Sequence, residues 1–171
     1  CILSDYQTIE IRFHSPIMIP EFEYEKHGVE DPRIVKIDDL FYLTYTSYDG
    51  INALGTLATS KDLKSWQKTG IIVPRISYKN FKLLSETQGT IAEKYKRFNE
   101  LPPSQKDNKE VFLWDKNVVF FPRRINGKLY FLHRIRPDIQ LVGIENMGDL
   151  NPDFWKDYLL NFKDHILLSP K

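Results

Sequence analysis

One short run of ionisable residues has the pattern of a reactive site: Glu30-Asp31-Pro32-Arg33, directly before an apolar segment. The proline should hold Asp31 in an extended conformation, which would fix the direction of its carboxylate. Glu30 and Arg33 are close enough in sequence to orient that carboxylate or to shift its pKa. A surface turn with an ion pair of little energetic value is an equally simple interpretation.

A second feature is a concentration of positive charge further along the chain. Between Lys116 and Arg136 there are six lysine or arginine residues and one histidine but no acidic residue, although the whole chain has a net charge of only +1. Side chains alternate between the faces of a strand, so His133 and Arg134 should point to opposite sides and only part of the strip can serve one site. The residues that best suit a solvated outer face are Arg123, Arg124 and Lys128, which flank a predicted turn. Lys116 and His133 lie among apolar residues and are the stronger candidates.

Four short strands are predicted around and after the first motif. Residues 33–37 and 41–46 are separated by a turn signal, and Asp49-Gly50 predicts a hairpin that leads into residues 53–59. A fourth short strand is expected near Trp66. Four antiparallel strands within about 45 residues make one propeller blade.

The same order of elements recurs later in the chain. Residues 118–124 lead through Asn126-Gly127 into residues 129–135, residues 139–145 follow, and a fourth strand is expected near Trp155. The two units align with Pro32-Arg33-Ile34 on Pro122-Arg123-Arg124, Phe41-Tyr42-Leu43 on Leu129-Tyr130-Phe131, Asp62-Leu63 on Asp149-Leu150, and Trp66 on Trp155. Internal repetition of this kind indicates a repeat architecture. The predicted fold is therefore all-β, with blade units at about 29–75 and 116–160, and with strand remnants such as residues 8–13.

Residues 78–110 do not fit the repeat. A helical segment near residues 84–100 has Ile91, Tyr95 and Phe98 on one face. We interpret this segment as a helical insertion between the blades. A lid, a contact in a homo-oligomer and a surface loop without a role all remain open for it.

Composition narrows the class of protein. With 171 residues, 42% of them hydrophobic, the chain can bury an ordinary core, and its near-neutral charge does not suggest disorder or affinity for nucleic acid. The single cysteine, Cys1, excludes an internal disulfide; no residue pattern suggests a metal site, and no apolar run has the length of a membrane span. The chain opens without methionine, and two blades cannot close a propeller. We therefore expect a fragment that lacks its true N-terminus, from a cytoplasmic protein.

Several motifs together resemble those of glycoside hydrolase family 130, which contains β-mannoside phosphorylases and some β-mannosidases. The matching elements are Glu30-Asp31-Pro32-Arg33, Tyr45-Thr46-Ser47-Tyr48, the run LATSKDLKSW that ends at Trp66, Lys116-Asn117, Phe121-Pro122 and His133-Arg134. The likeness runs in the right order from about Val29 to Trp155, without the insertion.

This resemblance implies a partial five-bladed β-propeller, with about two to three blades present and the active site at the central funnel. The residue that matches Asp31 is then the general acid, which delivers its proton through a hydroxyl of the bound mannose. The residues expected to bind phosphate are Lys116, His133, Arg134 and Arg75. The residues expected to contact the sugar are Glu30, Arg33, Tyr48, Asp115 and Asn117. No cofactor is expected apart from inorganic phosphate as co-substrate.

The charge pattern agrees with phosphorolysis. An inverting hydrolase needs two carboxyl groups, whereas phosphate is already nucleophilic and needs cations to hold it. The leading interpretation is an enzyme that cleaves β-mannosidic bonds with phosphate and releases mannose 1-phosphate. A β-mannosidase with Asp115 as a candidate second carboxylate and a sugar-binding propeller without catalysis remain as alternatives. The expected partners are a mannose-containing oligosaccharide and phosphate, and neither nucleic acid nor a membrane.

Two positions depart from the family pattern. Many phosphorylases of the family have an arginine after the first hairpin, where this chain has Asn52-Ala53-Leu54-Gly55, so that Arg75 would have to replace its charge. The family often has an aspartate after the lysine, where this chain has Asn117. Both departures leave hydrolysis open as an alternative.

Overall fold

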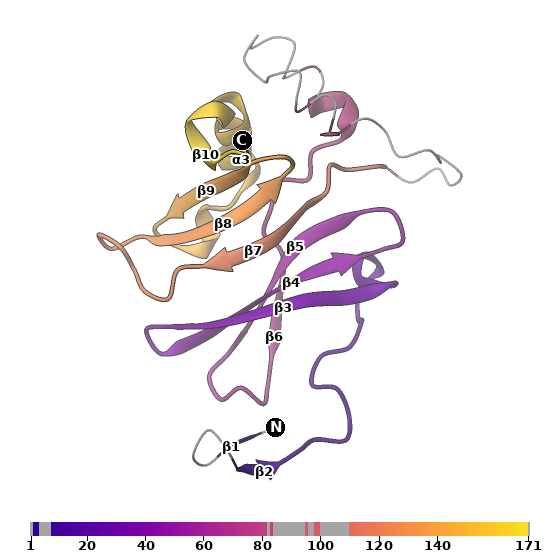
Figure 1. Cartoon of the computed structure of the whole chain (residues 1–171), viewed down its shortest axis with the longest axis vertical. Coiled ribbons are helices and arrows are strands. Elements are labelled where there is room, and N and C mark those ends of the chain that lie inside the picture. The colour runs from indigo at the N-terminus through magenta and orange to yellow at the C-terminus, as the bar shows by residue number, and fades with distance from the viewer. Residues whose placement is uncertain are drawn as a thin grey trace.

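The computed structural model describes residues 2–3, 8–81, 83, 95, 98–99 and 110–170 (Figure 1). This part of the chain is mostly β-sheet with few helices, as predicted. Its N-terminal elements are β1 (Ile2–Leu3), β2 (Ile9–Ile11) and the short 3₁₀ helix η1 (Glu23–Glu25). β1 and β2 pair with each other and lie apart from the main body, at the bottom of Figure 1.

The first four-stranded unit, which we call the first meander, contains all four predicted strands. Its strands are β3 (Gly28–Ile37), β4 (Leu40–Tyr48), β5 (Ala53–Ser60) and β6 (Gln67–Ile71), each antiparallel to the next. The carboxylate of Asp49 closes the turn between β4 and β5, because it accepts hydrogen bonds from the backbone N–H groups of Ile51 (2.8 Å) and Asn52 (2.6 Å). The hairpin predicted at Asp49-Gly50 is confirmed.

The second meander follows the same plan until its last strand. It contains β7 (Asp115–Phe120), β8 (Leu129–Ile135), β9 (Ile139–Ile144) and β10 (Ile166–Leu168). The strand predicted near Trp155 is wrong, since Trp155 lies on helix α3 (Pro152–Leu160). Asn151 begins this helix by accepting a hydrogen bond from the backbone N–H of Phe154 (3.0 Å), and Pro152 occupies its first turn, where a proline is well tolerated. Two 3₁₀ helices flank α3, η2 (Met147–Asp149) and η3 (Phe162–His165).

The two meanders join along β5. Leu54 of β5 pairs with Asp115 of β7 in parallel, and β6 pairs with the remainder of β5. The backbones come close here, because a Cβ atom built on Gly55 would lie 2.3 Å from Val118 Cγ2 and 2.9 Å from Val73 Cγ1. Only glycine fits at this position without a shift of its neighbours.

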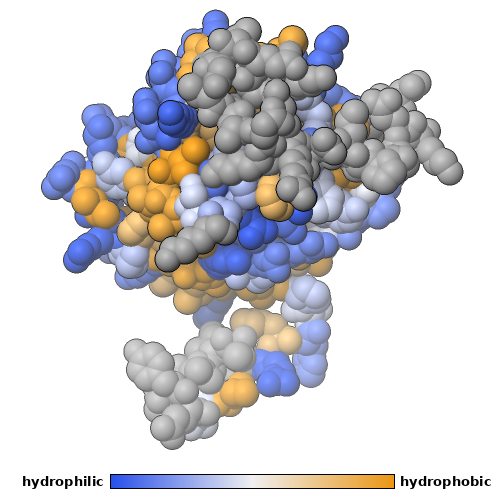
Figure 2. All heavy atoms as spheres, turned by 45° about the horizontal axis from the view of Figure 1, so that its top comes forward, coloured by the Kyte–Doolittle hydropathy of each residue, from blue (hydrophilic) through white to orange (hydrophobic). Residues whose placement is uncertain are grey.

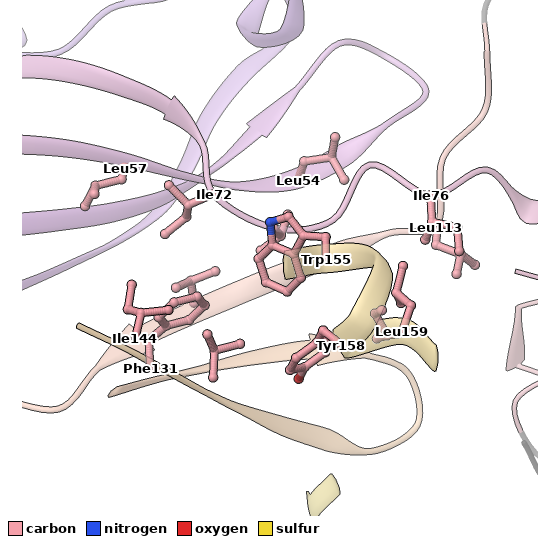
Figure 3. Packing of buried hydrophobic residues seen from close by; sticks show 14 of the residues in the cluster. Leu54, Leu57, Ile72, Ile76, Leu113, Phe131, Ile144, Trp155, Tyr158 and Leu159 are labelled. Atoms are coloured by element: carbon pink, nitrogen blue, oxygen red, sulfur yellow. The ribbon is translucent and has the colours of Figure 1, made fainter. Parts of the chain in front are cut away.

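One apolar core lies between the meanders and α3 (Figure 3). Leu54, Leu57 and Ile72 come from the first meander, and Phe131 and Ile144 come from the second. From α3, the side chains of Trp155, Tyr158 and Leu159 complete it. Phe131 has no exposed surface, and truncation of such a residue to alanine typically costs about 3–5 kcal/mol. The core therefore fixes the two meanders relative to each other.

The surface outside this core is mixed in character. Figure 2 shows hydrophilic side chains over much of the visible face, with hydrophobic atoms between them. The exposed large apolar residues of the N-terminal region are Ile9, Phe13, Ile17, Ile19 and Phe22. No helix in the described ranges is long and apolar enough to cross a membrane.

Most of the predicted helical insertion lies outside the described residues. Positions 78–81, 83, 95 and 98 are helical, whereas Ile91 is not described. Tyr95 is buried against Phe81 and Phe162, whereas Phe98 is exposed.

Candidate active site

The Glu30-Asp31-Pro32-Arg33 motif forms a β-bulge inside β3 rather than a surface turn. Asp31 and Pro32 together oppose the single residue Tyr45 of β4. Asp31 has a φ of 52°, so the extended conformation predicted from the following proline is wrong. The left-handed region costs aspartate less than most residues, and a bulge redirects the side chains that it contains. The guanidinium of Arg33 donates a hydrogen bond to the carbonyl of Asp31 (3.0 Å), and the Asp31 side chain is exposed.

The first strand of the second meander contains the same irregularity. Asn117 and Val118 of β7 oppose the single residue His133 of β8, and Asn117 has a φ of 62°. Asparagine also tolerates this region better than most residues. The two meanders thus share a backbone device that a repeat of strands alone would not require.

The bulges correct the predicted alignment of the two repeats. Asp31 is equivalent to Asn117, and Pro32 is equivalent to Val118 rather than to Pro122. The error arose because the loop between β7 and β8 is longer than the turn between β3 and β4, and Pro122 lies in that loop.

The two bulges lie beside each other across β4. The Thr44 hydroxyl of β4 donates to the carbonyl of Val118 in the β7 bulge (2.6 Å) and is 3.5 Å from the carbonyl of Arg33, the residue directly after the β3 bulge. Thr46, two residues further along the same strand, is 1% exposed, and its hydroxyl has no hydrogen-bond partner within the described ranges. Since buried polar groups are nearly always paired, Thr46 leaves an unsatisfied hydroxyl near both bulges.

Lys116 and Arg134 pair across β7 and β8 and line one small cavity, of about 160 Å³, together with Trp114 and Arg136. Lys116 Nζ is 5.5 Å from the centre of the Trp114 ring, and Arg136 Cζ is 5.9 Å from it. The Arg134 Nε atom is buried and has no hydrogen-bond partner among the described residues. No acidic side chain is among these lining residues, so the cavity is suited to an anion.

Tyr48 lies between this cavity and the beginning of β3. Its ring centre is 6.4 Å from that of Trp114, and its backbone pairs with Gly28. The indole N–H of Trp114 donates to the carbonyl of Ile51 (2.8 Å), which attaches the cavity wall to the turn after β4.

His133 does not join these cations. It lies on the opposite face of β8 from Arg134, as the alternation of side chains predicts, and it is fully buried. Its Nδ1 donates to the carboxylate of Asp115, 2.8 Å from both oxygens, and its Nε2 is 2.7 Å from the Tyr158 hydroxyl. With both ring nitrogens bonded inside the core, this geometry is at odds with the predicted phosphate contact of His133. Because Asp115 is fully buried beside it, the predicted sugar contact of Asp115 is also at odds with the structure.

Burial raises the pKa of the Tyr158 hydroxyl well above its usual range, and the negative charge of Asp115 raises it further. The hydroxyl therefore keeps its proton, and this cluster of three side chains is a buried structural network.

Arg75 also lies away from Lys116. It is exposed, its guanidinium is 5.1 Å from the centre of the Phe112 ring, and it lines a different cavity, of about 240 Å³, with Tyr24 and Asn52. The structure therefore does not bring Arg75 into the cation cavity as a replacement for the absent family arginine.

The remaining cations of the basic strip lie on the surface, as predicted. Arg123 and Lys128 are exposed, and Arg124 forms an ion pair with Asp38 (3.0 Å). Sequence reasoning missed Trp114 and Arg136 as parts of the cavity. The nearest signal in the sequence was that Trp114 lies two residues before Lys116 and Arg136 lies two residues after Arg134.

Comparison with known proteins identifies the family. Residues 6–101 match the family 130 glycoside hydrolase model, which is described as β-1,4-mannooligosaccharide phosphorylase. As this match covers more than half of the chain, the protein belongs to glycoside hydrolase family 130.

Two curated relatives come from Thermoanaerobacter sp. (strain X514). A 1,2-β-oligomannan phosphorylase is 30% identical over 160 residues, which cover 91% of this chain and 36% of the relative. A β-1,2-mannobiose phosphorylase is 38% identical over 95 residues, which cover 54% of this chain and 30% of the relative. The chain thus spans about a third of the length of the curated relatives that it matches.

Solved structures share the fold. The β-1,2-mannobiose phosphorylase from Listeria innocua, in complex with β-1,2-mannobiose, matches with a TM-score of 0.52 and 22% identity over 79% of this chain and 29% of that one. A glycosyl hydrolase from Bacteroides ovatus matches with a TM-score of 0.51 and 20% identity over 77% of this chain and 32% of that one.

Proposed function

We propose that the chain is part of an enzyme that cleaves β-mannosidic bonds with inorganic phosphate and releases mannose 1-phosphate. The family, together with relatives named 1,2-β-oligomannan and β-1,2-mannobiose phosphorylase, supports this reaction and favours the 1,2 linkage. The observation that carries the proposal is the contact between the two bulges through Thr44, because it brings the strand of Asp31 beside the strand of Lys116.

In this proposal each strand supplies one half of the chemistry. Asp31 gives a proton toward the leaving glycosidic oxygen, through a hydroxyl of the bound mannose. Lys116 and Arg134 hold phosphate so that one of its oxygens attacks the anomeric carbon from the opposite face. The bond from the anomeric carbon to the leaving oxygen breaks as the new bond to phosphate forms. Because the configuration inverts, a β-mannoside gives α-mannose 1-phosphate.

The remaining predicted residues are assigned to the sugar. Glu30 and Arg33 flank the bulge that contains Asp31, and Asn117 occupies the equivalent place in the second bulge. Tyr48 lies between the beginning of β3 and the cation cavity. An aromatic ring and short polar groups are suited to the C–H faces and hydroxyls of a pyranose.

We further propose that the two meanders are two blades, at about 29–75 and 116–160, of a five-bladed propeller that forms one catalytic domain. Two observations support this architecture. The meanders repeat the same antiparallel order and the same bulge, and the chain spans about a third of its relatives.

The test is an assay of the protein, with any sequence that flanks these residues in its gene, on β-1,2-mannobiose and on β-1,4-mannobiose. We expect turnover of the 1,2-linked disaccharide only when phosphate is present, with mannose 1-phosphate as a product. Equal release of free mannose without phosphate would show hydrolysis and reject the proposal. Hydrolysis is disfavoured by the position of Asp115, because this candidate second carboxylate is buried and bonded to His133.

A further inference from the structure

We propose that Arg136, held by Trp114, is a further phosphate-binding residue of this enzyme. The inference rests on the proposed phosphorolysis and assigns to its anion site a guanidinium from the end of β8. The group it would bind is a dianionic phosphate, either the free ion or the phosphate group of mannose 1-phosphate.

The first argument is the balance of charge in the cavity. Three cationic side chains, Lys116, Arg134 and Arg136, line a space of about 160 Å³, and the fourth lining residue, Trp114, is uncharged. Like charges this close disfavour one another unless an anion lies between them. No ion pair to a carboxylate is found for these three side chains in the described part of the chain.

The second argument is an unsatisfied donor. The Nε atom of Arg134 is buried and lacks an acceptor among the described residues, which is costly for a charged group. A phosphate in the cavity would supply acceptor oxygens. The space of about 160 Å³ is well above the roughly 10–15 Å³ that a single water needs, so one tetrahedral oxyanion of five heavy atoms has room in it.

The third argument is the rigid position of Arg136. Its guanidinium carbon is 5.9 Å from the centre of the Trp114 ring, and Lys116 Nζ is 5.5 Å from the same centre. Trp114 is itself held by its hydrogen bond to Ile51 and by the edge of Tyr48. One indole ring thus positions two cations by cation–π contacts, which lowers the entropic cost of gathering them around an anion.

The kinetic test compares Arg136→Gln with the unchanged enzyme. We expect the KM for phosphate to rise about 10- to 100-fold, as for the loss of one charged hydrogen bond, with the KM for β-1,2-mannobiose unchanged. Arg136→Lys should recover part of the loss. In the reverse direction, the KM for mannose 1-phosphate should rise by a similar factor if Arg136 binds the phosphate group from either source; a change for free phosphate alone restricts the contact to the free ion.

Arg123→Gln is the matched control, since it removes an exposed arginine from the β7–β8 loop of the same meander. It should leave both KM values unchanged. An active Arg136→Gln enzyme with an unchanged KM for phosphate overturns the inference. If the KM for phosphate rises in Arg75→Gln instead, the phosphate contact belongs to Arg75. If Arg136→Gln fails to fold, Trp114→Phe replaces it as the test, with a smaller rise in the KM for phosphate expected.

Calorimetric titration with inorganic phosphate separates this inference from the proposed function. If the enzyme proves to be a hydrolase and Arg136→Gln still weakens phosphate binding, the phosphate contact of Arg136 is confirmed and the proposed phosphorolysis is wrong. If the enzyme is a phosphorylase and Arg136→Gln binds phosphate normally, the proposed phosphorolysis is confirmed and the phosphate contact of Arg136 is wrong.

Discussion

The bulges of β3 and β7 share one backbone irregularity, but their side chains carry opposite charges. In each, two residues oppose one, and the first of the two has a positive φ. The residue before the bulge is Glu30 in the first meander and Lys116 in the second, and the bulged residue is Asp31 in one and Asn117 in the other. The comparison indicates that one structural device, used twice, can present an acid from one strand and cations from its neighbour.

The side chains behind the two bulges differ in a similar way. Opposite Asp31, the hydroxyl of Tyr45 donates to buried Glu25 (2.6 Å), which also pairs with Lys68 (2.6 Å). Opposite Asn117, His133 bonds to Asp115 and Tyr158 instead. Each bulge therefore rests on a buried hydrogen-bond network, but only the first network contains a lysine. These differences can be tested.

The largest effect is expected at the proposed acid, Asp31. Asp31→Asn keeps the shape and the positive φ but removes the proton donor, so kcat for phosphorolysis of β-1,2-mannobiose should fall about 10²- to 10⁴-fold. Asp38→Asn is a matched control, because Asp38 also has a positive φ (53°) and lies at the other end of β3. If both variants lose the same activity, Asp31 is not the acid.

The next largest effect concerns the stability of the two networks. His133→Phe leaves the Asp115 carboxylate buried without its partner and should lower the free energy of unfolding by about 3–5 kcal/mol. Tyr45→Phe should cost only about 1 kcal/mol, because Glu25 keeps Lys68 as a partner. Urea unfolding of both variants measures the difference.

A combined variant provides the control for that measurement. Asp115→Leu with His133→Phe should recover part of the lost stability, because neither buried polar group remains unpaired. Equal destabilisation by His133→Phe and Tyr45→Phe contradicts the comparison. If a His133 variant folds normally and its only defect is a raised KM for phosphate, the prediction that His133 contacts phosphate would be correct after all.

The smallest effect is a difference in acid sensitivity. Burial lowers the pKa of His165, which stacks on Tyr158 at 3.8 Å, so the unfolded chain takes up this proton first, and stability should begin to fall as the pH drops below about 6.5. Burial alone would raise the pKa of Glu25, but its hydrogen bonds with Lys68 and Tyr45 outweigh burial and lower it. The contribution of Glu25 should therefore persist until the pH drops below about 4.3 and then be lost.

Urea midpoints measured across this range check the order of the two losses. His165→Gln should remove the first decline, and Glu25→Gln should remove the second. A first decline that survives in His165→Gln would assign it to another group.

Much of this architecture could be predicted because it depends on local signals. The Asp49-Gly50 hairpin and the strand at residues 129–135 follow from turn residues and alternation, and the structure confirms both. The strand near Trp155 was wrong because the Asn151 cap and Pro152 favour a helix there. A residue before proline prefers an extended conformation, but Asp31 adopts a positive φ in the bulge. Pairing along the whole length of β3 outweighs this one local preference.

The candidate site was less predictable because it depends on contacts between distant strands. The resemblance to the family's motifs, and not their spacing alone, pointed to Asp31, Lys116 and Arg134. Whether His133 faces the cations or the core depends on the side of β8 that packs against α3, and no local pattern specifies that side. Arg136 and Trp114 become neighbours only once β7 and β8 pair.

The close approach of the backbones at Gly55 affects the distance between the two strands that carry the proposed reacting groups. Any larger residue there would push against Val118 and move β7 outward, and Lys116 and Asn117 would move with it. In the proposed reaction, the distance that the attacking phosphate oxygen must cross to reach the sugar would increase, and such distances tolerate little change. Gly55 contacts neither proposed reactant but sets the distance between the strands that hold them. Replacing it should therefore slow the reaction while both ligands still bind.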